Sequence, residues 1–244
     1  MKSKLTLLLS LTFLFLFSSS IYGDNSEVKK EYWSNGNLRM ETHYKNEKKY
    51  GLRTWWYKSG EKEGEVHFRN GKPEGLAIEW FESGDKKNEF FYKAGKVEKQ
   101  GKEWYVSGQK KRITHFKNGK LDGLETDFYK SGEKKSEIYY KAGKPEGLET
   151  KWYASGKQKR ETYYRDGRRH GLETELHENG RKKSIRYYKK GLLDGMITEW
   201  YPSGKKKSTS HYKSGIQNGF RKEWNKDGKL IFQKNFVDGN EEIK

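Results

Sequence analysis

Histidines and acidic residues are the side chains in this sequence that could carry metal or acid–base chemistry. Four of the six histidines share one position of a 24-residue period. They are His43, His67, His115 and His211. The chain has no cysteine, and no carboxylate accompanies these histidines at the fixed spacing that a metal site requires. Because tyrosine, phenylalanine or asparagine fills the same position in other periods, we interpret histidine there as one planar side chain among several and predict no metal site.

The acidic residues recur in two rows with the same period. One row is Glu79, Glu103, Asp127, Glu175, Glu199 and Glu223, and the other is Glu41, Glu65, Glu89, Glu137 and Glu161. Paired carboxylates can act as general acid and base, but an active site is a unique constellation that breaks a repeat's symmetry. We therefore expect these carboxylates to pair with lysines across strands. With no nucleophile motif or phosphate-binding loop in the sequence, we predict no catalytic residue, no cofactor and no small-molecule substrate.

A 24-residue repeat positions these side chains, and residues 123–146 (GLETDFYKSGEKKSEIYYKAGKPE) show it most clearly. Two short runs of aromatic and β-branched residues end at Ser131-Gly132 and at Ala142-Gly143. Such runs between glycine turns indicate a β-hairpin, and a fixed period of this length is typical of a solenoid. We expect an all-β, elongated solenoid or ribbon of nine hairpins. The nine units are 27–50, 51–74, 75–98, 99–122, 123–146, 147–170, 171–194, 195–218 and 219–242.

Four aromatic-rich columns run through the repeats. The two most uniform columns, which contain Phe128 and Tyr140, are expected to form the core. Their sequence neighbours alternate to the opposite face and are expected to form an outer contact surface. The candidate partner-binding residues on that surface are Tyr129, Tyr139, Tyr153, Tyr163 and Tyr187. One unit opens with Lys99, where most other units open with glycine, and has Gly101 nearby. This difference predicts a bent or bulged hairpin there.

The net charge is +18, and its excess recurs just after each Ser-Gly turn. The candidate polyanion-binding residues are Lys86, Lys87, Lys110, Lys111, Lys134, Lys135, Lys182, Lys183, Lys206 and Lys207. Adjacent repeats would place these pairs about 10 Å apart and form a basic edge. Two interpretations remain open. The lysines could keep the sheet edge soluble, or they could bind anionic lipid, lipopolysaccharide or another polyanion. Nucleic acid is not the expected partner.

Residues 1–23 differ in composition from the rest of the chain. Lys2 and Lys4 precede a mostly apolar run, Leu5–Phe17, and a small residue, Gly23, follows soon after. This arrangement is typical of a secretory signal peptide, and the apolar run is short for a membrane span. We therefore expect residues 24–244 to form one repeat domain that is exported to the periplasm or outside the cell.

The repeat resembles the variant MORN (membrane occupation and recognition nexus) repeat, in particular the form found in bacterial YwqK-type antitoxin proteins. A typical copy carries Gly75-Leu76, Trp80-Phe81, Ser83-Gly84, Lys86-Lys87, Tyr92 and Gly95-Lys96, and the resemblance covers residues 27–242. It implies a solenoid of β-hairpins that binds protein or lipid without catalysis. The leading hypothesis is an exported scaffold, antitoxin-like or immunity-like, that binds a protein partner through its aromatic face. The alternatives are electrostatic binding through the lysine edge and a purely structural spacer.

Overall fold

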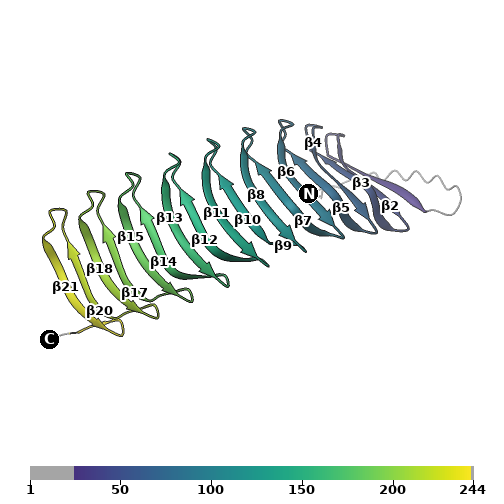
Figure 1. The fold of residues 1–244 in the computed structure, drawn as a ribbon. Coiled ribbons are helices and arrows are strands. Elements are labelled where there is room, and N and C mark those ends of the chain that lie inside the picture. Colours follow the sequence, from purple (N-terminus) through teal and green to yellow (C-terminus); the bar gives the residue numbers. More distant parts are fainter. Residues whose placement is uncertain (1–24, 243–244) are drawn as a thin grey trace, which may run out of the picture. The chain divides into compact units, whose positions relative to one another are not determined.

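The computed structural model describes residues 25–242, so the predicted signal peptide, residues 1–23, lies outside the described residues. All regular structure in this range is β, with 22 strands and no helix, as Figure 1 shows. The strands follow one another in chain order and pair antiparallel. The described residues include no helix that is long and apolar enough to cross a membrane. The expected all-β fold of hairpin repeats is confirmed.

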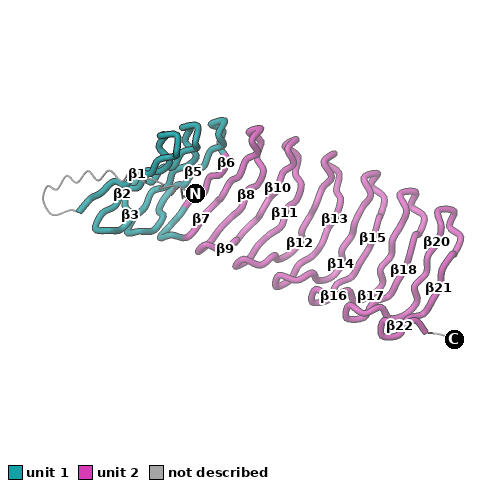
Figure 2. The backbone as a smooth tube through the Cα atoms, turned by 180° about the vertical axis from the view of Figure 1, so that it is seen from behind, with its two compact units in different colours: residues 1–86, 92–95 teal, residues 87–91, 96–244 magenta. Residues whose placement is uncertain are grey.

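The described residues form two compact units, which Figure 2 distinguishes by colour. Unit 1 comprises the described residues up to Lys86 together with residues 92–95. Unit 2 comprises residues 87–91 and the described residues from Lys96 onward. The strands of unit 1 are β1 (Ser26–Tyr32), β2 (Leu38–Lys45), β3 (Lys48–Trp56), β4 (Lys62–Arg69) and β5 (Lys72–Trp80). β6 (Lys86–Lys93) has residues in both units.

Unit 2 contains the remaining strands, and three of its hairpins have a long strand divided into two short ones. The strands are β7 (Lys96–Trp104), β8 (Lys110–Lys117), β9 (Lys120–Leu121), β10 (Gly123–Phe128), β11 (Lys134–Lys141), β12 (Lys144–Trp152), β13 (Gln158–Arg165), β14 (Arg168–Leu176), β15 (Lys182–Lys189), β16 (Leu192–Leu193), β17 (Gly195–Trp200), β18 (Lys206–Lys213), β19 (Ile216–Gln217), β20 (Gly219–Trp224), β21 (Leu230–Val237) and β22 (Asn240–Glu241).

Two kinds of turn join the strands, and glycine has a different role in each. In the two-residue turn Asp166-Gly167, both residues have positive φ, 52° and 81°. This is the type I′ geometry, which matches the twist of the flanking strands. In the second kind, the Gly156 amide donates to the Tyr153 carbonyl at 2.9 Å and the Tyr153 amide donates to the Lys157 carbonyl at 2.8 Å. These bonds describe a three-residue loop closed by a glycine bulge.

Both kinds of turn are also bonded to the neighbouring repeat. The Gly167 amide donates to the Pro145 carbonyl at 3.0 Å, 22 residues earlier in the chain. The Asp166 amide donates to Glu146 Oε2 at 2.8 Å. At the opposite end of the hairpin, the Tyr153 hydroxyl donates to the Leu176 carbonyl, 23 residues later, at 2.7 Å. The hairpin of residues 147–170 is therefore tied to the preceding repeat at one end and to the following repeat at the other.

The bent or bulged hairpin predicted at Lys99 and Gly101 is not seen at these residues, where β7 pairs with β8. Lys99, inside β7, adopts the left-handed conformation itself, with φ of 62°, as Gly75, Gly147 and Gly171 do at the equivalent position of other strands. β7 and β8 pair without interruption through Gly101, which faces Thr114. The glycine instead makes room for an aromatic ring, because a Cβ at this position would lie 2.5 Å from the Phe90 ring. Gly101 is thus needed because a larger residue would clash with Phe90.

The most buried side chains of unit 2 lie on one face of its sheet, and most of them are polar. Thr162 and Ser184 are each 1% exposed and Glu173 is 2% exposed. Register places Thr162 opposite both Glu149 and Glu173, so these side chains share a face. Tyr188 belongs to the column expected to form the core and is buried, but its neighbours on this face are charged and hydroxylated. The expectation of a mainly aromatic core is therefore wrong for unit 2.

Candidate protein-binding surface

The opposite face of unit 2 carries a row of exposed hydrophobic pairs, which we call the apolar stripe. Each pair lies directly across two strands of one hairpin: Leu124 faces Tyr139, Leu148 faces Tyr163 and Leu172 faces Tyr187. Met196 and Phe220 continue the row in the last two repeats. These eight side chains are between 42% and 59% exposed.

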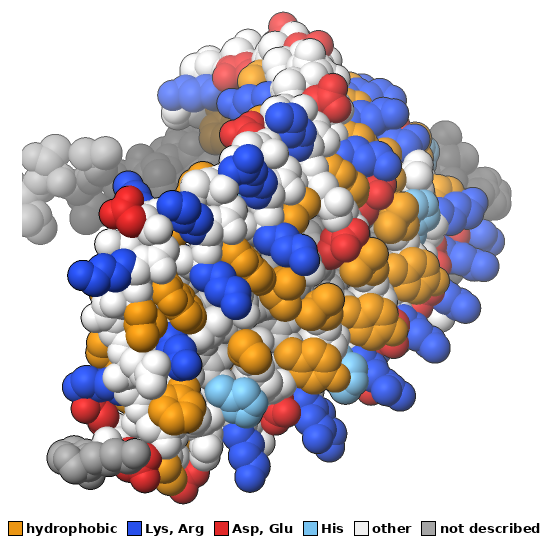
Figure 3. Space-filling model, turned by 60° about the vertical axis from the view of Figure 1, so that its left-hand side comes forward, with side chains coloured by type: hydrophobic (Ala, Val, Ile, Leu, Met, Phe, Trp, Pro, Cys, Tyr) orange, Lys and Arg blue, Asp and Glu red, His pale blue; other side chains and the backbone are white. Residues whose placement is uncertain are grey.

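The stripe exists because side chains alternate along a strand. Tyr163 and Tyr164 are adjacent in β13 and must point to opposite faces. Tyr164 is half-buried, and Tyr163 is exposed. Five successive hairpins at ~4.8 Å per strand extend the row over about 40 Å. Figure 3 shows such rows of hydrophobic side chains on one face, with Lys and Arg beside them. A contiguous exposed apolar surface of this kind marks an interaction site.

Three of the five predicted contact residues belong to the stripe, and two do not. Tyr139, Tyr163 and Tyr187 are exposed as expected. Tyr129 and Tyr153 are half-buried at the hairpin ends, and their hydroxyls donate to the carbonyls of Trp152 and Leu176, both at 2.7 Å. The expectation that both variable columns form an outer face is therefore wrong for the column of Tyr129 and Tyr153, which joins one repeat to the next.

The leucine half of the stripe was not predicted from the sequence. Leu124, Leu148 and Leu172 each follow the glycine that opens a repeat. A strand alternates its side chains, so a leucine paired with an exposed tyrosine must also be exposed. The signal was present in the recurring Gly-Leu dipeptide, but recognising it required the cross-strand register.

A row of cations borders the stripe at the type I′ turns, and we call these residues the turn-end cations. In register, Lys117 faces Lys120, Lys141 faces Lys144 and Arg165 faces Arg168. All six are exposed. Like charges placed directly opposite destabilise a sheet, and no carboxylate among the described residues forms an ion pair with any of the six. Because Lys141 is two residues from Tyr139 in β11, both side chains lie on the same face.

The predicted lysine edge at the Ser-Gly turns lies in a different electrostatic setting. Its lysines are exposed except for Lys87, which is half-buried. Several are paired with acids of their own hairpins: Lys183 Nζ lies 2.9 Å from Glu175 Oε1, and Lys134 Nζ lies 2.7 Å from Glu137 Oε1. Lys111 and Lys207 form similar pairs with Glu103 and Glu199. The turn-end cations, which were not predicted from the sequence, therefore have fewer acidic partners than the lysines at the Ser-Gly turns.

The buried polar face is held together by ion pairs and hydrogen bonds. The Thr162 hydroxyl donates to Glu173 Oε2 at 2.9 Å, and Arg186 Nη1 lies 3.3 Å from Glu173 Oε1. Burial alone would raise the pKa of the Glu175 carboxyl, but the hydrogen bond and charge of Lys183, with Arg186 and Arg160, outweigh burial and lower it. Because many polar groups of this face bond to one another, it is less suited to binding than the apolar stripe.

Four histidines lie within hydrogen-bond distance of backbone carbonyls, and three of these carbonyls belong to the following repeat, including that of Trp200 for His177. His43 Nδ1 lies 2.6 Å from the Leu52 carbonyl, and His115 Nδ1 lies 2.6 Å from the Leu124 carbonyl. His211 Nδ1 lies 2.8 Å from the Asn218 carbonyl. Within residues 25–242, no three His, Asp or Glu side chains come together in a group that could hold a metal ion. These histidines therefore support the hairpins.

Comparison with known proteins identifies the repeat. No curated protein matches the chain. The family model described as a MORN repeat variant matches residues 28–46, 49–70, 121–142 and 193–214. Each match covers most or all of one hairpin around its three-residue glycine loop, two in unit 1 and two in unit 2. MORN repeats are non-catalytic modules that bind protein or lipid. The four matches, together with the all-β hairpins, support a MORN-repeat protein.

Proposed function

We propose that this protein is a non-catalytic scaffold that binds a protein partner along the apolar stripe of unit 2. The observation that carries the proposal is the row of eight exposed hydrophobic side chains from Leu124 to Phe220, of which six form leucine–tyrosine pairs. Leucine–tyrosine pairs on a rigid sheet offer a large contact area at low conformational cost. The opposite face offers no comparable row, because its side chains are largely engaged with one another.

The turn-end cations define the chemistry of the partner. Lys141 and Lys144 lie beside the stripe without an acidic partner of their own. A bound surface that carries carboxylates along one edge of an apolar ridge would relieve the repulsion between these cations. We therefore expect an acidic protein partner. Export through the sequence of residues 1–23 would bring the scaffold to that partner in the periplasm or outside the cell. The resemblance to YwqK-type antitoxins makes a toxin one class to test.

The proposal can be tested with a photo-crosslinking residue placed at adjacent positions on opposite faces. Substitution at Tyr163 puts the crosslinker on the stripe, and substitution at Tyr164 puts it on the buried polar face. We expect the Tyr163 position to crosslink to one acidic protein in the native cells and the Tyr164 position to give none. Equal crosslinking at both positions, or none at Tyr163, would contradict the proposal.

Binding to an anionic surface is a second candidate, which the unpaired turn-end cations favour. Vesicles that contain phosphatidylglycerol, compared with vesicles of phosphatidylcholine alone, would detect it. This candidate predicts binding that collapses between about 50 and 200 mM salt, since it depends on charge at a solvent-exposed surface. It also predicts loss of binding when Lys141, Lys144, Arg165 and Arg168 are replaced by glutamate. A stripe variant such as Leu148→Asp would leave this binding unchanged, and would abolish binding to the protein partner.

A further inference from the structure

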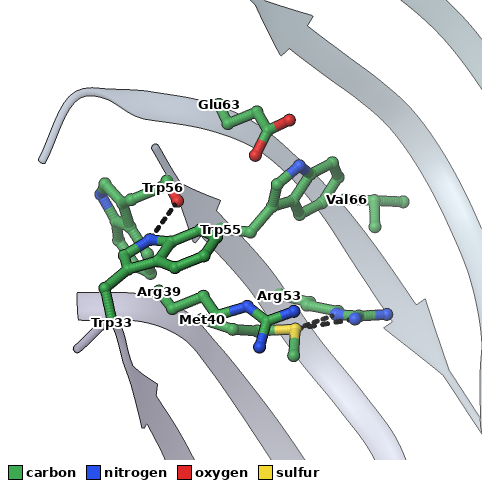
Figure 4. Close-up of a pocket in the computed structure, with 8 residues that line it drawn as sticks. All are labelled: Trp33, Arg39, Met40, Arg53, Trp55, Trp56, Glu63 and Val66. Atoms are coloured by element: carbon green, nitrogen blue, oxygen red, sulfur yellow. Dashed lines mark hydrogen bonds between the residues drawn. The ribbon is translucent and has the colours of Figure 1, made fainter. Parts of the chain in front are cut away.

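A pocket opens in unit 1 on residues that belong to the first two repeats. Its volume is about 320 Å³, which lies within the range of small-ligand sites. The indoles of Trp33, Trp55 and Trp56 line it together with Arg39, Arg53 and Glu63. Figure 4 shows Trp33 and Trp55 on two sides of the hollow, Glu63 at its upper rim and Arg39 below Trp33. None of these residues belongs to the apolar stripe.

The pocket is built from positions at which the repeat is broken. Trp55 replaces the acid that most other repeats carry at this position, such as Glu79 and Glu103. Glu63 replaces a lysine, which recurs as Lys87 and Lys111. Tryptophan and glutamate each occur at these positions in only one of the nine repeats, so the repeating architecture does not require them. Trp55 removes a negative charge and Glu63 replaces a positive charge by a negative one, and both residues line the same pocket. We interpret this coincidence as a sign that the pocket has a function of its own.

The strand opposite Trp55 is adapted to its ring. Gly64 faces Trp55 in the register of β3 and β4. A Cβ at Gly64 would lie 2.2 Å from the indole, so only glycine leaves room for the ring in this position. Gly64 does not have the positive φ of the turn glycines. Glycine at position 64 is therefore needed for the space that it leaves, which the Trp55 indole fills.

Several polar groups of the pocket lack a strong partner in the part of the chain that the structure describes. Arg53 directs Nε and Nη2 to the Met40 sulfur at 3.1 and 2.7 Å, and a thioether is a weak acceptor. No carboxylate forms an ion pair with Arg53, and Glu63 has neither a hydrogen bond nor an ion pair. The indole N–H of Trp33 donates to the Trp56 carbonyl at 3.0 Å, whereas those of Trp55 and Trp56 have no protein acceptor.

We propose that this pocket binds a saccharide unit that carries a carboxylate. The flat C–H face of a sugar ring packs on indole faces, and the ring's hydroxyls both donate and accept hydrogen bonds. Such a ligand can donate to Glu63, accept from the indole N–H groups and place its carboxylate on Arg53 in a charge-assisted pair. Arg39, which also lines the pocket and whose guanidinium carbon lies 4.9 Å from the Trp33 ring centroid, adds positive charge.

A free aromatic amino acid or a peptide terminus is the competing ligand. It would also stack on the indoles and offer a carboxylate to Arg53 and an ammonium to Glu63. It has too few further hydrogen-bonding groups for the two indole N–H donors. A polyhydroxylated ring satisfies more of the unpartnered groups, and unpaired buried polar groups weaken binding.

The test is titration of the purified repeat domain with three probes, followed by tryptophan fluorescence and calorimetry. The probes are an oligosaccharide of uronic acids, a neutral oligosaccharide of the same length and phenylalanine, which has both an ammonium and a carboxylate. We expect the uronic acid probe to bind and to change the fluorescence of the pocket indoles. Arg53→Gln should weaken its binding about tenfold or more, as expected for loss of a charged hydrogen bond. Trp152→Phe, in unit 2, is the control that should leave the affinity unchanged.

Two further variants separate a ligand site from a cap on the end of the sheet. Trp55→Glu and Glu63→Lys restore the residues of the other repeats. For a ligand site, we expect both variants to fold and to lose binding. The proposal is overturned if the uronic acid probe does not bind, if the neutral oligosaccharide binds equally well or if phenylalanine binds better. It is also overturned if Trp55→Glu lowers stability while Arg53→Gln leaves affinity unchanged.

Discussion

Removal of one tyrosine hydroxyl, in Tyr153→Phe, should weaken the attachment between two adjacent repeats. The Tyr153 hydroxyl donates to the Leu176 carbonyl in the following hairpin at 2.7 Å. The same bond recurs from Tyr105, Tyr129 and Tyr201 to carbonyls 23 residues later. In a repeat protein, stability is a sum of repeat and nearest-neighbour contributions. Loss of one such bond should therefore act mainly on one interface.

The magnitude follows from the environment of the bond. A neutral intramolecular hydrogen bond contributes about 0.5–1.5 kcal/mol net. Tyr153 is half-buried, so water can reach the freed carbonyl in part and the full cost of an unsatisfied buried acceptor does not apply. We expect Tyr153→Phe to lower the free energy of unfolding by about 1 kcal/mol. Tyr129→Phe acts on the preceding interface, so the double variant should lose about 2 kcal/mol if the two interfaces are independent.

Urea denaturation and amide hydrogen exchange together would measure this effect. Exchange should accelerate most around the three-residue loop that follows Leu176, where the His177 and Gly180 backbone groups close the turn. Tyr163→Phe is a matched control, because Tyr163 is exposed and its hydroxyl has no hydrogen bond among the described residues. That variant should change stability by less than about 0.5 kcal/mol. Equal effects of the two variants would refute the role of the Tyr153 hydroxyl.

Three further predictions follow from individual side chains. Burial raises the pKa of the Tyr57 and Tyr153 phenols above the ordinary value of 10.0. Their contribution to the free energy of unfolding should therefore be complete below about pH 10 and lost as pH rises through the raised pKa. In urea titrations at alkaline pH, Tyr153→Phe should lose less unfolding free energy than the unchanged protein does. Gly101→Ala should cost about 1–3 kcal/mol by overpacking against Phe90, and Phe90→Leu should relieve part of that cost in a double-variant cycle; additive costs would contradict the contact. Mass spectrometry of the protein secreted by its native cells should show a chain that begins after Gly23, and an intact N-terminus would refute export through cleavage there.

Much of the fold could be predicted from the sequence because its period is visible at the turns. A two-residue hairpin needs two positive φ angles, and Gly167 and its equivalents reveal that need every 24 residues. The run lengths between glycines then fix two strands per repeat. Lys99 replaces a different glycine, one that lies inside a strand in most other repeats, and it takes the same left-handed conformation, with φ of 62°. The replacement therefore did not disturb the pairing of β7 with β8.

The candidate surface was predicted only in part, because its assignment depends on contacts between repeats. Tyr139 and Tyr129 look alike in the sequence, but only the structure shows that the Tyr129 hydroxyl reaches a carbonyl 23 residues away. The burial of Glu173 was equally hidden, since Thr162 and Arg186 reach it from neighbouring strands. The pocket of unit 1 was different. Trp55 and Glu63 stand where other repeats have an acid and a lysine, so the signal was present in the sequence.

The central claim is that alternation along the strands of unit 2 exposes one tyrosine of each adjacent pair and shields the other. The pairs Tyr139-Tyr140, Tyr163-Tyr164 and Tyr187-Tyr188 test it directly. Limited tyrosine nitration, with the modified residues located by mass spectrometry, should label the first member of each pair much faster than the second, most clearly at Tyr187 and Tyr188, which are 45% and 8% exposed. Equal labelling within the pairs, or faster labelling of Tyr140, Tyr164 and Tyr188, would show that the apolar stripe does not face solvent.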